Sequence, residues 1–228
     1  MKRFALLGKK PFQFTIVGAL LFLVFTIVGM FTYAGGTHSN PDSPGYSFFR
    51  NFFSSLGMTV APNGESNTVS LVLFILAMFC AGLALIVYFI VEPKFFWDSL
   101  PLKMLSSLGS IFGVIAGAFF IGVAFPGDLY PDLHGFFTLN AFRTFLIAVI
   151  FYLIAILINR RYPKRYAIVY AAFAVMLFVY ILLMMYGPGF DDPNGEVIQA
   201  TSQKLIVYAA IICMMIQAYG SMKLVEAS

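Results

Sequence analysis

Residues 141–158 read AFRTFLIAVIFYLIAILI and contain a single charged side chain, that of Arg143. The hydrocarbon core of a bilayer is about 30 Å thick and takes about 20 helical residues to cross. A membrane-spanning strand would alternate apolar and polar residues, and this stretch does not. It therefore predicts a helix in lipid. The composition agrees, because 61% of the residues are hydrophobic and 11% are charged, whereas soluble domains are about 25% charged.

Runs of this kind occur six times in the chain. We therefore predict an all-α integral membrane protein, a six-transmembrane-helix bundle that forms a single domain over residues 1–228. The first run follows the basic start MKRFALLGKK, but it is longer than the apolar core of a signal peptide, about 7–15 residues, so we expect it to be retained as a helix. The predicted helices cover about 12–34, 68–91, 105–125, 138–159, 166–187 and 201–222.

The basic residues predict how the bundle is oriented. An even number of spans places both termini on one side, and all but three of the 14 Lys and Arg residues fall on that side. The positive-inside rule then predicts cytoplasmic termini and a cytoplasmic membrane location. These residues are ordinary anchors for lipid headgroups, so we expect membrane lipids as partners and no nucleic acid. They are Lys2, Arg3, Lys9, Lys10, Lys94, Lys103, Arg160, Arg161, Lys164, Arg165 and Lys223.

The longest predicted outer connection, residues 35–67, contains the sequence YSFFRNFFSSLG at residues 46–57. At about 100° per residue, its Phe and Leu side chains share one helical face and its polar side chains share the other. This pattern predicts an amphipathic helix in the outer interface that ends at Gly57. The helix is either an anchor in the membrane plane or a lid over an outer pocket, with Arg50 and Asn51 facing inward.

The third apolar run carries Gly109, Gly113 and Gly117 at four-residue spacing. Small residues at this spacing allow helix backbones to approach closely, so we predict that this helix packs at the centre of the bundle. The same ridge, together with the lack of a clear catalytic motif, favours one alternative function. In that alternative the chain is an accessory or structural subunit of a larger membrane complex, with protein partners in the membrane.

Two cations, Arg143 and Lys204, fall inside predicted spans, where ionisable groups usually face protein or water. A guanidinium pairs best with a carboxylate or a phosphate. Together with Arg50, these residues place three cations on the predicted outer side. The leading prediction is therefore an outer-facing polar pocket that binds a lipid or another amphiphile. Its candidate ligand-binding residues are Arg50, Asn51, Asn67, Asp128, Asn140, Arg143 and Lys204.

The link PGDLYPDLHGFF, residues 126–137, predicts a different alternative, a membrane-embedded hydrolase. His134 would activate an outer hydroxyl such as that of Ser54, and Asp132 would orient the imidazole ring. If the fourth helix began near Leu133, nine residues would separate His134 from Arg143 and place them about 180° apart around its axis. A polar loop that caps the helix is the simpler interpretation. The histidines and aspartates show no metal-ligand spacing, so we predict no metal and no cofactor.

Several short elements resemble an uncharacterised family of prokaryotic membrane proteins, the domain of unknown function numbered 998. They are FFSSLG at residues 52–57, Asn67, the glycine-rich third run, and VAFPGDLYPDLHGFF at residues 123–137. The resemblance implies a six-helix bundle and a paired outer site that contains Ser54, Asn67 and His134, but it implies no activity. The family has Ser-Asp-Leu-Gly before its second helix, and Ser55 stands at that acidic position here.

Overall fold

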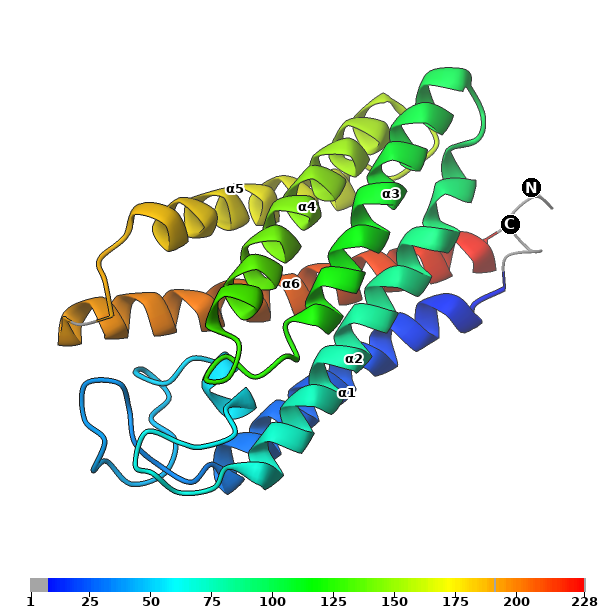
Figure 1. Cartoon of the computed structure of the whole chain (residues 1–228). Coiled ribbons are helices and arrows are strands. Elements are labelled where there is room, and N and C mark those ends of the chain that lie inside the picture. The colour runs from blue at the N-terminus through cyan, green and yellow to red at the C-terminus, as the bar shows by residue number, and fades with distance from the viewer. Residues whose placement is uncertain (1–7, 191, 228) are drawn as a thin grey trace.

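The computed structural model describes residues 8–190 and 192–227, and this part of the chain forms an all-α bundle without strands (Figure 1). All six long helices are long and apolar enough to cross a membrane, which confirms the predicted six-helix bundle. Two short 3-10 helices, η2 and η3, lie in the connections. The helices are α1 (Lys10–Thr32), η2 (Ser54–Gly57), α2 (Thr68–Val91), η3 (Glu92–Phe96), α3 (Leu100–Gly122), α4 (Pro131–Ile158), α5 (Arg165–Tyr186) and α6 (Pro193–Glu226).

Each helix packs against the next one in the chain, and α6 returns against α1, so the six helices close a ring. The start of α1 and the end of α6 lie at the same end of the bundle, where Lys9 Nζ is 2.9 Å from Glu226 Oε1. The long connection between α1 and α2 lies at the opposite end (Figure 1). Lys2 and Arg3, which contribute to the predicted orientation, lie outside the described residues.

The helix bounds differ from the predicted ones mainly at N-termini. The bounds of α2 agree with the prediction, whereas α4 starts at Pro131 instead of residue 138 and α6 starts at Pro193 instead of residue 201. Proline is well suited to a first helical turn because its φ angle is already helical and it lacks an N–H group that would need a partner. At α6, the Asp192 side chain also accepts a hydrogen bond from Gly195 N at 3.1 Å. Apolar runs reveal only the part of a helix that lies in lipid.

The amphipathic helix predicted over residues 46–57 is wrong. Residues 48–50 form a turn, and only Ser54–Gly57 form a short 3-10 helix. Side chains take the backbone donors instead: Ser47 N donates to Asn51 Oδ1 at 2.8 Å and Phe52 N donates to Ser55 Oγ at 3.0 Å. Such local bonds compete with helix formation. The apolar face is also divided, because Phe53 is buried whereas Phe49 is 59% exposed.

The glycines of α3 lie where other backbones and rings come close. A Cβ atom on Gly117 would lie 2.7 Å from the carbonyl oxygen of Gly82 on α2. A Cβ atom on Gly109 would lie 2.8 Å from Cδ2 of Tyr152 on α4. Helix α3 therefore packs tightly between α2 and α4, as the glycine spacing predicts, but it is one member of the ring and does not lie at the centre of the bundle.

Candidate functional site

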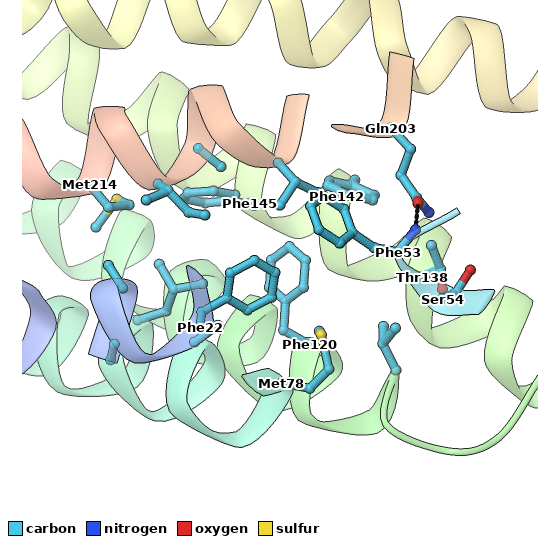
Figure 2. A pocket seen from close by; sticks show the side chains of 18 of the residues that line it. Phe22, Phe53, Ser54, Met78, Phe120, Thr138, Phe142, Phe145, Gln203 and Met214 are labelled. Carbon is cyan, nitrogen blue, oxygen red and sulfur yellow. Dashed lines mark hydrogen bonds between the residues drawn. The ribbon is translucent and has the colours of Figure 1, made fainter. Parts of the chain in front are cut away.

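An apolar cavity lies inside the ring of helices (Figure 2). Its volume is about 100 Å³, it is partly open, and it is lined from α1, α2, α3, α4, α6 and the segment before α2. None of the lining residues is charged. Its largest side chains are those of Phe22, Phe53, Phe74, Phe120, Phe142 and Phe145. The interior of the bundle therefore holds a space suited to an apolar group.

The cavity has hydrogen-bonding side chains at one end. Figure 2 shows Ser54, Thr138 and Gln203 gathered there, on the side opposite Met214. Gln203 Oε1 accepts a hydrogen bond from Phe53 N at 2.7 Å. Thr138 Oγ1 is buried and has no hydrogen-bond partner among the described residues. The space is therefore amphipathic, with a long apolar wall and a small polar end.

The segment 46–57 closes this polar end, and α6 holds the segment through polar contacts. Lys204 Nζ donates to the carbonyl oxygen of Asn51, and both residues are buried. The same ammonium faces the rings of Tyr46, Phe48 and Phe53, at 5.3 to 5.8 Å from their centroids. Such cation–π contacts stabilise a desolvated ammonium. Lys204 thus binds a segment of this chain, and its contacts account for its burial.

Glu196, on the same face of α6, contacts the connection between α1 and α2 at a second place. Its carboxylate accepts from His38 N at 2.8 Å and from both the amide and the hydroxyl of Ser39. It also pairs with Arg50, whose guanidinium lies 3.3 Å away. The sequence prediction missed Glu196 because α6 was expected to start at residue 201. The spacing of Glu196, Ala200 and Lys204, four residues apart on one helical face, is the signal that could have found it.

The three cations predicted to share one pocket, Arg50, Arg143 and Lys204, each contact a different partner. Arg50 lies on the outer surface, where it lines an open polar hollow with Ser39 and Ser47. Arg143 instead donates to Met185 Sδ of α5 at 3.1 Å. The side chain faces α5 because of its helical position, which the sequence could not relate to α6.

The predicted polar residues near these cations have structural partners. Asn140 Nδ2 donates to Phe136 O of its own helix at 2.8 Å. Asn67 is buried, donates to the carbonyl oxygens of Leu56 and Met58 at 3.1 Å each, and accepts from Ala34 N at 3.3 Å. Asn67 therefore joins two parts of the connection between α1 and α2 to the start of α2.

Asp128 joins the α3–α4 link to the connection between α1 and α2. Its carboxylate accepts from Thr59 N at 2.9 Å, from the Thr59 hydroxyl and from Val60 N at 3.2 Å. Partial burial by itself would raise the pKa of Asp128, but these hydrogen bonds outweigh burial and hold the pKa below its ordinary value. The residue thus acts as an ionised clamp between two connections.

The catalytic group predicted around His134 is not assembled. Because α4 starts at Pro131, His134 lies in its first turn and Arg143 points to the opposite side of the helix. His134 Nδ1 is 2.9 Å from Phe125 O, and the ring packs on Gly127. In the described part of the chain, no hydrogen bond joins His134 to Ser54 or Asp132. Residues 8–190 and 192–227 contain no group of three or more His, Cys, Asp or Glu side chains that could hold a metal ion.

A buried acid, Glu92, lies at the other end of the bundle. It is 1% exposed and accepts hydrogen bonds from the Tyr162 and Ser221 hydroxyls, each at 2.8 Å. Burial raises the pKa of Tyr162 above its ordinary value, so its hydroxyl keeps the proton that it donates to Glu92. In the sequence Glu92 appears only as one acid beside a basic end, so nothing in the local pattern predicts this network.

These features define a multi-pass α-helical membrane protein with an internal amphipathic cavity. The chain matches no protein-family model, no curated protein and no solved structure. The resemblance to the uncharacterised membrane family and the alternative role as an accessory subunit both stay predictions.

Proposed function

We propose that this membrane protein binds the apolar chain of a lipid or another amphiphile in its central cavity. The observation that carries the proposal is the lining: apolar side chains from five helices surround the space, and the hydrogen-bonding groups Ser54, Thr138 and Gln203 lie at one end. Ligand sites commonly combine an apolar wall with a few convergent polar groups that set the orientation of the ligand.

The size of the cavity favours one chain over a two-chain lipid. Its volume of about 100 Å³ is of the same order as an engineered apolar cavity of about 150 Å³ that binds benzene. The part of an amphiphile nearest its head group, with a volume of about 100 Å³, fits this space when the head lies at Thr138. Because the cavity is partly open, the rest of a longer chain can leave it.

The free energy of binding then comes from packing and hydrogen bonds. A chain that moves from the bilayer into the cavity exchanges one apolar environment for another, so the hydrophobic effect contributes little. The rings of Phe22, Phe120 and Phe145 supply close contacts. The hydrogen-bonding groups at the polar end of the cavity determine how the binding free energy differs from one amphiphile to another.

The proposed location is the cytoplasmic membrane, with both termini inside. Its support is the excess of Lys and Arg at the end of the bundle that carries the termini, as the positive-inside rule requires. The polar end of the cavity and the segment that closes it then face outward.

The proposal is tested by filling the cavity. In Ala210→Phe a ring enters the lining, whereas Ala118→Phe adds the same ring on an exposed face of α3. The wild type and Ala118→Phe, purified in mild detergent, should carry a co-purifying amphiphile in native mass spectra, and Ala210→Phe should lose it. The proposal is overturned if the wild type carries no such species, or if folded Ala210→Phe carries as much as the control.

A further inference from the structure

We infer that the cavity selects an amphiphile whose head is an uncharged oxygen group, an alcohol or a carbonyl, and that Thr138 makes the selecting hydrogen bond. This inference rests on the proposed function and names the ligand class of the same site. It differs from the outer pocket predicted from the sequence, in which three cations would bind an anionic or zwitterionic headgroup.

The first observation is the absence of charge in the cavity wall. Thr15, Ser54, Thr138 and Gln203 are the polar side chains that line the cavity, and none of them is ionisable. A carboxylate, phosphate or ammonium head placed there would lose its water and gain no opposite charge. Burying an unpaired charge is far more costly than burying a hydrogen-bonded neutral group. The wall therefore disfavours ionised heads.

The second observation is that the two nearby cations already have partners. Lys204 follows Gln203 in the chain, but its ammonium donates to Asn51 O and to Ala200 O. Arg50 pairs with Glu196 on the outer surface. Phe53 takes part in both environments, since its ring lines the cavity and also faces the Lys204 ammonium. An anionic head in the cavity would find an aromatic ring on that side and no free cation.

The third observation concerns the hydrogen-bonding groups at the polar end. The Thr15 hydroxyl, which lines another part of the cavity, already donates to the backbone carbonyl oxygen of Ala84 at 3.2 Å. Gln203 Oε1 already accepts from Phe53 N, which leaves the Gln203 side chain one further acceptor position and its N–H donors. The Thr138 hydroxyl is buried and without a partner among the described residues. A hydroxyl can both donate and accept, so Thr138 matches either an alcohol or a carbonyl oxygen.

The test compares ligands with one chain and different heads. Native mass spectrometry of the full-length protein in mild detergent measures binding of 1-tetradecanol, methyl tetradecanoate, tetradecane, tetradecanoate and tetradecyl phosphate. We expect the alcohol and the ester to bind about tenfold more tightly than the alkane, which is the effect of about one net hydrogen bond. The two anions should bind more weakly than the alcohol.

Variants of α4 assign the effect to Thr138. Thr138→Val keeps the shape and should remove the preference for 1-tetradecanol over tetradecane, whereas Thr138→Ser should restore it. Thr144→Val is the matched control, because the Thr144 hydroxyl donates to Asn140 O of its own helix at 2.7 Å and does not line the cavity. The preference of Thr144→Val for 1-tetradecanol over tetradecane should equal that of the wild type. The elution volume in size-exclusion chromatography checks the fold of each variant.

The outcomes separate the two proposals. If no compound of the series binds, the proposed function fails. If tetradecane or either anion binds as tightly as 1-tetradecanol, the function stands and the inference about the head group is overturned. The inference is also overturned if Thr138→Val keeps the wild-type preference.

Discussion

Lys204 on α6 donates a hydrogen bond to the carbonyl oxygen of Asn51, which lies 153 positions earlier in the chain. Both residues are almost completely buried, at 1% and 2% exposure. The pair joins the segment that closes the cavity to the helix that forms one of its walls. An ammonium in this setting acts as a structural tether, which explains why a charged side chain is tolerated inside the bundle.

Lys204→Met should loosen segment 46–57. The variant removes the Lys204 donor and leaves the Tyr46 hydroxyl, at 3.1 Å, as the remaining side-chain donor to the Asn51 carbonyl oxygen. We expect this to cost about 1 kcal/mol of folding free energy, the net contribution of one hydrogen bond. Trypsin should therefore cleave after Arg50 faster in the variant than in the wild type. Lys94→Met, at an exposed lysine, is the control and should cleave at the wild-type rate. Equal cleavage of Lys204→Met and the control would show that Lys204 does not hold the segment.

Tyr162→Phe should destabilise the opposite end of the bundle. It removes a hydroxyl donor to the buried carboxyl group of Glu92. We expect a loss of about 1–2 kcal/mol, since hydrogen bonds inside membrane proteins contribute modestly and an unsatisfied buried acceptor adds to the loss. Thermal unfolding in detergent measures this loss of stability as a lower midpoint temperature. Tyr219→Phe, at an exposed tyrosine of α6, should leave the midpoint unchanged. Equal midpoints for the two variants would contradict the role of the Glu92 network.

The clamp made by Asp128 should depend on pH. Its pKa is lower in the folded protein than in the unfolded chain, so its stabilising effect is present above the ordinary carboxyl pKa of about 3.9. The effect is lost as the pH falls through the lowered folded pKa. Hydrogen exchange at the Thr59 and Val60 amides should therefore rise at acid pH in the wild type.

Asp128→Asn should show fast exchange at these amides already at neutral pH, with little further change on acidification. Asp42→Asn, at an exposed aspartate, should follow the wild-type profile. If Asp128→Asn also keeps the profile of the wild type, another group controls this connection.

The orientation is tested with single cysteines in a Cys80→Ala, Cys213→Ala background. Glu65→Cys and Arg160→Cys place exposed thiols at opposite ends of the bundle. A membrane-impermeant maleimide should label Glu65→Cys in intact cells and Arg160→Cys only after the membrane is opened. The reverse pattern would place the termini outside and overturn the proposed topology.

Helix positions were largely predictable, whereas helix starts and the site were not. The apolar run 68–91 coincides with α2 because its whole length is buried in lipid or protein and its ends meet polar residues. The starts of α4 and α6 lie in polar sequence, so hydropathy missed them. In segment 46–57 the periodicity suggested a helix, but side-chain bonds from Asn51 and Ser55 to the backbone compete with it.

By itself, the sequence determined that this chain is a bundle of six lipid-spanning helices. That conclusion follows from composition and local order, because a long apolar stretch in lipid must satisfy its own backbone hydrogen bonds. Only the tertiary structure decided that Lys204 meets Asn51, that Arg143 turns to α5, and that Thr138 lies at the polar end of a cavity. Those relationships depend on the rotation of each helix about its axis, which is set by packing between elements far apart in the chain.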